Sequence, residues 1–254
     1  MHRRAVLGVG FLALLTACSN PTDDAGGDDR KPRRFTDSAG LVSDYLVFAR
    51  NVRRPAGLLL FFHGDGAWEP DPARSAALGG AGGIIEQARR RNLVTALLRT
   101  PDTGTNTWYR NGAANAAWTA ELLTDLQHRY DTDNRRIWLV GYSGGAHFLT
   151  RQLIPARSEL IGGGGAVLFS GGGPPSDQTA ELNPQLRNDF RMFFYVGADD
   201  TNTAGRLNSV TTAEAGERWY AAAGIRVDHE FPPGVGHDLG DRMGPVLGRQ
   251  LDLR

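Results

Sequence analysis

The hydrophobic pattern divides most of the chain into short apolar runs separated by longer segments with a helical period. Most of the apolar runs are continuous rather than alternating, which is typical of strands that are buried on both faces. The runs of strand length are Tyr45–Phe48, Leu58–Phe62, Leu93–Leu98, Ile137–Val140, Ala166–Phe169, Met192–Val196 and Val227–Phe231.

The segments between these runs repeat apolar residues at helical spacing. They are Ile84–Arg91, Ala113–Tyr130, Ala146–Ile154, Thr211–Ala223 and Val246–Leu251. Strands that alternate with helices predict βαβ units, in which consecutive strands run parallel. The pattern therefore predicts an α/β protein with a mainly parallel central sheet and helices on both faces.

The first eighteen residues have the features of an export signal. Arg3 and Arg4 precede an apolar run from residue 5 to 17, which is too short to span a bilayer about 30 Å thick as a helix. The run ends in Leu15-Thr16-Ala17-Cys18, which resembles the lipobox of bacterial lipoproteins. This resemblance implies that residues 1–18 are a lipoprotein signal peptide and that Cys18 is lipidated. An ordinary secretory signal with a chance cysteine and a twin-arginine export signal are the alternatives.

Residues 19–34 differ sharply in composition from the rest of the chain. They contain eight charges and two prolines but no large apolar side chain. Such a segment cannot bury surface, so it is expected to form a flexible charged linker. The folded domain is expected to comprise residues 35–254.

Charge and cysteine content exclude several classes of protein. The 28 basic and 28 acidic residues balance, whereas nucleic-acid binders usually carry a basic excess. A single cysteine permits no intrachain disulfide and no zinc cluster of cysteines. Lys31 is the only lysine, which argues against Schiff-base and P-loop chemistry. We expect neither nucleic-acid binding nor a metal or organic cofactor.

The segment Gly141-Tyr142-Ser143-Gly144-Gly145 matches the pattern G-x-S-x-G. It directly follows the predicted strand Ile137–Val140, and a helical pattern begins after it. A sharp turn between a strand and a helix needs small residues around the serine and exposes the hydroxyl near a helix N-terminus. Ser143 is therefore a candidate nucleophile; the alternative is a glycine-rich turn with a passive serine.

A serine nucleophile needs a base and an acid, which follow it in the order Ser, Asp or Glu, His in this type of architecture. His237 lies in a glycine-rich loop after the last predicted strand, and it alone among the histidines combines the correct order with a mobile position. Asp199 and Asp200 follow the strand Met192–Val196. Either carboxylate could accept the imidazole N–H and orient the ring.

Four segments together resemble the α/β-hydrolase superfamily. They are His63-Gly64-Asp65-Gly66, Gly141–Gly145, Gly197-Ala198-Asp199-Asp200 and Gly234–Asp238. The resemblance covers the chain from about residue 41 to the C-terminus. It is greatest to secreted esterases of the polyhydroxybutyrate-depolymerase and feruloyl-esterase type, to which the segment Tyr130–Ile137 is also similar. One departure is Gly144-Gly145, where such esterases often have Ala-Gly.

The resemblance implies a role for several residues. It favours Asp200 over Asp199 as the acid, because many such hydrolases read Gly-x-x-Asp at this turn. It also implies that the backbone N–H groups of Asp65 and Gly144 form the oxyanion hole. A carboxylate beside an oxyanion is unfavourable, so we expect the Asp65 side chain to turn away or to pair with an arginine. His63 is then expected to anchor its loop rather than to act as a base.

The substrate site is expected to be open. Many α/β-hydrolases carry a cap domain after the sixth strand, but only about 20 residues separate Phe169 from Met192. Trp108 and Tyr109, in the polar loop from Thr100 to Asn111, and Trp68 are candidates for lining the substrate pocket. The alternative for Trp108 and Tyr109 is packing beneath their loop. Trp118 and Trp138 are expected to lie in the core.

Together these features favour an exported, lipid-anchored serine hydrolase of the cell envelope. Its expected reaction is cleavage of a small or polymeric carboxylic ester through Ser143, Asp200 and His237, with an acyl-enzyme intermediate. Lipidated Cys18 would hold it on the membrane outside the cytoplasm, and a released secreted form is the alternative. A serine peptidase or amidase of the same fold and a non-catalytic surface-binding lipoprotein are the other hypotheses.

Overall fold

One sheet of eight strands forms the centre of the protein in the computed structural model, which describes residues 31–67, 75–201 and 208–253. The strands lie in the order β1-β2-β4-β3-β5-β6-β7-β8. Their bounds are β1 Arg33–Thr36, β2 Val42–Phe48, β3 Ala56–Phe62, β4 Leu93–Leu98, β5 Thr132–Tyr142, β6 Gly164–Phe169, β7 Phe190–Tyr195 and β8 Arg226–Glu230. Only the pairs β1–β2 and β2–β4 are antiparallel, so the prediction of a mainly parallel sheet is confirmed.

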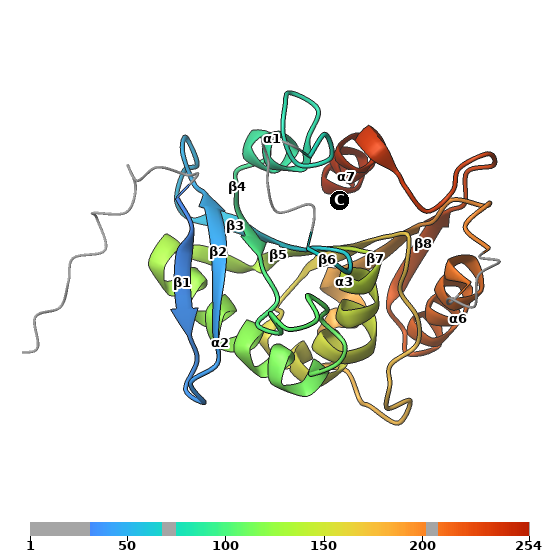
Figure 1. Cartoon of the computed structure of the whole chain (residues 1–254), viewed down its shortest axis with the longest axis horizontal. Helices are drawn as coiled ribbons and strands as arrows, with labels where there is room; N and C mark the ends of the chain where they lie inside the picture. The colour runs from blue at the N-terminus through green and yellow to red at the C-terminus, as the bar shows by residue number, and fades with distance from the viewer. Residues whose placement is uncertain (1–30, 68–74, 202–207, 254) are drawn as a thin grey trace, which may run out of the picture.

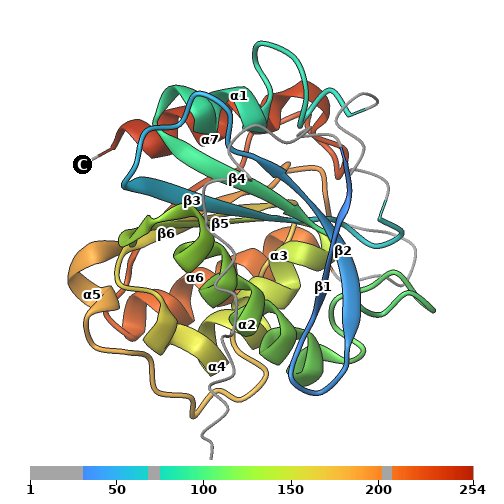
Figure 2. The ribbon, with the colours of Figure 1, turned by 90° about the vertical axis from the view of Figure 1, so that its left-hand side faces the viewer.

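Helices cover both faces of this sheet (Figures 1 and 2). One face packs against α1 (Ile84–Arg90) and α7 (Met243–Asp252). The other face is covered by α2 (Gly112–Tyr130), α3 (Gly144–Phe148), α4 (Ile154–Arg157), α5 (Leu186–Asp189) and α6 (Ser209–Ala222). The three-layer arrangement confirms the predicted fold class.

The core explains why the strand pattern is continuous. All seven residues of β3 are buried. Leu58 and Leu60 point into the layer of α2, whereas Leu59 and Phe61 point into the layer of α1 and α7. Because successive side chains of a strand face opposite sides, a strand covered on both faces is apolar at nearly every position.

The sequence pattern missed β1 and placed the linker boundary slightly too late. Arg33 and Arg34, assigned to the charged linker 19–34, form the first half of β1 and pair with Tyr45 and Asp44 of β2. An edge strand needs backbone hydrogen bonds on one side only, and β1 alternates exposed and half-buried residues, so it lacks a continuous apolar run.

The helix predicted after Ser143 is interrupted. A π-helical turn, Leu149–Leu153, lies between α3 and α4, and single 3₁₀ turns occur at Ser158–Leu160 and Gly240–Arg242. Apolar periodicity alone does not distinguish a π-helical turn from an α-helix, because both keep a continuous buried face.

Several sequence predictions lie outside the described residues. These include the signal peptide 1–18 with Cys18, most of the linker, and Trp68. Among the helices that the structure does describe, none combines the length and the apolar character needed to cross a membrane.

The connection between β6 and β7 is short. Residues 170–189 are all described, and their only helix is the single turn α5. No cap domain is therefore inserted at this point, as the spacing predicts.

Candidate active site

Ser143 lies in a sharp turn between a central strand and a helix. Strand β5 ends at Tyr142 and α3 begins at Gly144, so Ser143 is the single residue between them. Its φ of 50° with ψ of −114° is a conformation that non-glycine residues rarely adopt. The flanking glycines make this turn possible: a Cβ at Gly145 would overlap the carbonyl oxygen of Phe62, and one at Gly141 would lie 2.6 Å from the Ala146 nitrogen.

Three side chains from three separate loops form one hydrogen-bonded chain. The Ser143 Oγ lies 2.9 Å from His237 Nε2, and His237 Nδ1 lies 2.7 Å from Asp200 Oδ2. A carboxylate can only accept, so Nδ1 carries a proton, and in the neutral imidazole Nε2 is then the acceptor for the Ser143 hydroxyl. The Asp200 side chain is 8% exposed and that of His237 is 46% exposed, so the carboxylate is buried behind an accessible imidazole.

The geometry distinguishes the two candidate acids. Asp200 contacts the His237 ring, whereas Asp199 is exposed and contributes its backbone N–H to the Val235 carbonyl at 2.9 Å. This last bond ties the turn after β7 to the loop that carries His237. Asp199 therefore supports the loop through its backbone.

Tyr142 and Ser170 fix the loop of His237 through hydrogen bonds, a role that the sequence analysis did not assign. The Ser170 hydroxyl donates to the His237 carbonyl oxygen at 2.7 Å, and the Tyr142 hydroxyl donates to the same oxygen at 3.2 Å. Both residues stand at the carboxyl ends of adjacent parallel strands, where ligand sites of open α/β sheets gather. That position is the signal that could have identified them.

The backbone segments predicted to form the oxyanion hole are adjacent. A Cβ at Gly144 would lie 3.4 Å from the Asp65 nitrogen and would overlap Asp65 Oδ1. Asp65 Oδ1 therefore lies close to the Gly144 backbone. The expectation that the Asp65 side chain turns away from the oxyanion or pairs with an arginine stays a prediction. The overlap also explains why glycine rather than alanine follows Ser143.

His63 is a buried anchor of this loop. Its Nδ1 lies 2.6 Å from the Gly64 carbonyl oxygen and therefore donates, while its Nε2 accepts from the Thr100 N–H at 3.0 Å. Both nitrogens are thus engaged by backbone groups. Burial lowers the pKa of His63 from 6.5 to about 4, so the ring is neutral at pH 7. The structure agrees with the expected anchoring role.

His147 lies one helical turn after Ser143 and was not assigned by the sequence analysis. Its Nδ1 is buried and has no hydrogen-bond partner. Burial and the charges of Arg151 and His237 lower its pKa to about 4. The ring is therefore neutral at pH 7, so it does not repel a proton arriving on His237.

Because His63 and His147 are buried, we expect the free energy of unfolding to fall in acid. Their pKa is 6.5 when unfolded and about 4 when folded, so the unfolded chain binds more protons between these pH values. Stability from this source is present above pH 6.5 and is lost as the pH falls towards 4. For His63 the free energy of unfolding is expected to fall by about 2 kcal/mol from pH 7 to pH 5.

Urea unfolding of the wild type, His63→Gln and His147→Gln at pH 7, 6 and 5 measures this loss. Each variant is expected to show a weaker pH dependence than the wild type. His128→Gln, at an exposed position of α2, is the matched control and should retain the wild-type dependence. A His63→Gln curve parallel to that of the wild type would contradict the burial argument.

The three aromatic candidates for the substrate pocket have different outcomes. Trp108 is completely buried and packs against Phe62 and Phe148, so the prediction that it lines a substrate pocket is wrong and the alternative of packing beneath the loop is confirmed. Tyr109 is 48% exposed and stays a candidate. Trp68 lies outside the described residues. Trp118 and Trp138 are buried in the core, as predicted.

No metal site accompanies this arrangement within the described part of the chain. There, no three His, Cys, Asp or Glu side chains come together in a group that could hold a metal ion. The polar groups at the site are instead those of a hydroxyl, an imidazole and a carboxylate.

Solved structures with the same fold carry esterase names. A carboxylesterase from Mesorhizobium loti has 18% identity and a TM-score of 0.64, covering 87% of this chain and 98% of its own. An acetyl xylan esterase from Aspergillus awamori has 14% identity and a TM-score of 0.64, covering 87% and 98%. A poly(3-hydroxybutyrate) depolymerase from Bordetella parapertussis has 16% identity and a TM-score of 0.60, covering 88% and 90%.

At this level of identity the likeness shows the fold: the chain has the α/β-hydrolase fold. Comparison with family models found no match, and comparison with curated protein sequences found none either.

Proposed function

We propose that this protein is a serine hydrolase that cleaves carboxylic esters. The observation that carries the proposal is the hydrogen-bonded chain from Ser143 through His237 to Asp200 at a strained strand–helix turn. A serine hydroxyl is a weak nucleophile unless an adjacent base takes its proton, and this chain supplies such a base with its orienting acid. A binding protein that had lost activity would have no need to retain this arrangement.

The proposed reaction follows the positions of the donors and acceptors. Ser143 Oγ attacks the ester carbonyl while His237 Nε2 takes the hydroxyl proton, and the C–O bond to the alcohol breaks as Nε2 returns that proton to the leaving oxygen. Asp200 keeps the imidazole in the required tautomer and stabilises the imidazolium. The Asp65 and Gly144 N–H groups stabilise the oxyanion. Water then attacks the acyl-enzyme while His237 Nε2 takes a proton from it, and Nε2 passes this proton to Ser143 Oγ as the acyl bond breaks and the acid leaves.

The names of the solved structures support an ester rather than an amide as substrate. The three structures compared above are called carboxylesterase, acetyl xylan esterase and poly(3-hydroxybutyrate) depolymerase. The short connection between β6 and β7 also leaves the site without a cap at that edge, which suits an ester presented on a surface or in a polymer.

We further propose that the protein acts outside the cytoplasm as a lipoprotein. The apolar run that ends in Cys18 supports this, because the only cysteine of the chain occupies the position that lipidation requires. Several acyl chains on Cys18 would anchor the protein stably, and the charged linker would separate the domain from the membrane.

Covalent labelling tests the reaction. A fluorophosphonate is expected to add once to the purified domain, with a mass increase that is absent from Ser143→Ala and His237→Ala, because only an activated serine reacts. Intact mass spectrometry measures the adduct, and circular dichroism checks that the variants are folded. The same samples are then assayed with p-nitrophenyl esters and peptide amides.

The outcomes separate the hypotheses. Labelling with ester turnover supports the proposal. Labelling with preferential amide turnover would replace it by a peptidase or amidase, and a folded wild type that neither labels nor turns over would indicate a binding protein.

A further inference from the structure

A small cavity is lined in part by the chain neighbours of Ser143 and His237. Its volume is about 310 Å³, and its walls come from the segment before α1, from the end of β5 and from the segment leading into α7. The lining residues include Ser75, Ala76, Tyr142, Asp238, Leu239 and Met243. This size is at the lower end of ligand pockets, roughly 300–1,000 Å³, so it suits one small group rather than a polymer segment.

Two of the residues that line the cavity are chain neighbours of the residues proposed to react. Tyr142 immediately precedes Ser143, and Asp238 immediately follows His237. The Tyr142 ring lies 5.5 Å from the His237 ring between centroids, and its hydroxyl donates to the His237 carbonyl oxygen. These contacts connect one wall of the cavity to the loop that carries His237.

The part of an ester that concerns this cavity is the leaving alcohol. His237 Nε2 must pass its proton to the oxygen of the leaving alcohol, so that oxygen has to lie within hydrogen-bond reach of the ring. Asp238 and Leu239, which wall the cavity, directly follow His237 in the chain, so the loop that carries this ring also bounds the cavity.

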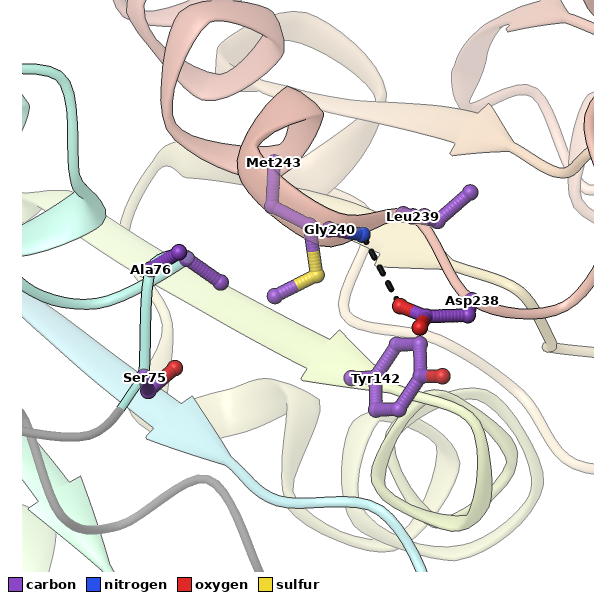
Figure 3. A pocket seen from close by; sticks show the side chains of 8 residues that line it. Ser75, Ala76, Tyr142, Asp238, Leu239, Gly240 and Met243 are labelled. Carbon is purple, nitrogen blue, oxygen red and sulfur yellow. Dashed lines mark hydrogen bonds between the residues drawn. The ribbon is translucent and has the colours of Figure 1, made fainter.

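One side of the cavity is apolar and the other is polar. Figure 3 shows the Met243 thioether reaching into the space between Ala76 and Asp238, and Leu239 adds to this apolar side. On the polar side, Asp238 Oδ1 accepts the Gly240 N–H at 2.9 Å. The second carboxylate oxygen has no hydrogen-bond partner among residues 31–67, 75–201 and 208–253, so it can accept from a ligand. A ligand that binds the Asp238 carboxylate must itself supply a hydrogen-bond donor.

We propose that this cavity is the subsite for the leaving alcohol of the ester and that it selects small alcohols carrying a hydrogen-bond donor, above all a cationic one. Ala76 and Met243 limit the size of the alcohol, and Asp238 accepts its donor. The proposal rests on the proposed ester hydrolysis, and it assigns specificity to residues outside the chain of Ser143, His237 and Asp200.

Filling the cavity tests the size limit. Ala76 is exposed, so Ala76→Phe adds a ring at the cavity wall without entering the core. The ratio of kcat/KM for 3-methylbutyl acetate to that for methyl acetate is expected to fall about tenfold or more. Ala81→Phe, at an exposed position that does not line the cavity, is the matched control and should retain the wild-type ratio.

Exchanging the carboxylate tests the donor preference. At pH 7, 2-(dimethylamino)ethyl acetate carries an N–H⁺ where 3-methylbutyl acetate has a C–H, and the two alcohols have the same shape. The wild type is expected to prefer the cationic ester. Asp238→Asn retains the oxygen that accepts from Gly240 but presents an NH₂ group, so this preference should fall about tenfold. Asp241→Asn makes the same charge change outside the cavity and should retain it.

The results distinguish failure of this inference from failure of ester hydrolysis. Fluorophosphonate labelling counts the active sites in every variant, so a misfolded variant is recognised. Suppose that the variants react with the fluorophosphonate and hydrolyse esters, but Ala76→Phe leaves the ratio for 3-methylbutyl to methyl acetate unchanged and Asp238→Asn leaves the preference for the cationic ester unchanged. The subsite assignment is then wrong. It is also wrong if Ala76→Phe changes the ratio between methyl butyrate and methyl acetate instead, because the cavity would then hold the acyl group. A wild type without labelling or ester turnover would overturn the proposed function itself.

Discussion

Replacing Ser143 with alanine is expected to lower kcat for ester hydrolysis by about 10⁶-fold. The alanine removes the atom proposed to form the acyl-enzyme, and His237 Nε2 loses the hydroxyl that lies 2.9 Å from it. The backbone strain stays the same, because serine and alanine both carry a Cβ at the φ of 50°. Steady-state hydrolysis of p-nitrophenyl acetate, extended to high enzyme concentration, measures the effect.

A matched variant separates loss of the nucleophile from general damage. Ser176→Ala removes an exposed hydroxyl that contacts Gln152 on the same side of the sheet as α3, and it should retain wild-type turnover. Turnover by folded Ser143→Ala within tenfold of the wild type would remove Ser143 from the proposed reaction.

Exchanging Asp200 for asparagine is expected to lower kcat by about 10⁴-fold with little change in KM. The asparagine NH₂ group can face His237 Nδ1 as a donor, which drives the imidazole into the tautomer with its proton on Nε2. That nitrogen can then no longer accept the Ser143 proton. Substrate contacts are unchanged, because Asp200 is buried behind the ring. Measuring kcat and KM separately with p-nitrophenyl acetate tests this.

Asp199→Asn is the matched control for this variant. It makes the same chemical change at the neighbouring, exposed position, and it retains the backbone bond from residue 199 to Val235. Near-wild-type kcat is expected. If Asp199→Asn were the inactive variant and Asp200→Asn the active one, the assignment of the acid would be reversed.

Much of the layer structure could be predicted from local patterns. Leu58–Phe62 is apolar throughout, and Leu93–Leu98 contains only one polar residue, Thr95, because both faces of their strands are covered. This requirement is visible in the local sequence. Whether a strand lies at the edge of the sheet cannot be recognised from the local sequence in the same way. Strand β1 pairs on one side only, so its residues alternate and the pattern reads as part of the linker.

In the candidate site, too, local patterns predicted some features and missed others. Ser143 and His237 were predicted from local turn chemistry and chain order, and the structure brings them within hydrogen-bond distance. Trp108 illustrates the opposite case, because its polar neighbours in the sequence suggested a pocket while Phe62 and Phe148, distant in the chain, enclose it completely.

By itself the sequence determined the order of most strands and helices and the residue types at their ends, because hydrophobic period and turn chemistry are local properties. Only the tertiary structure decided which groups meet. Asp200 rather than Asp199 contacts His237, Ser170 and Tyr142 support the histidine loop, and Asp65 lies against Gly144. These contacts join segments from different strands, and their geometry depends on sheet order and twist, which no single segment encodes.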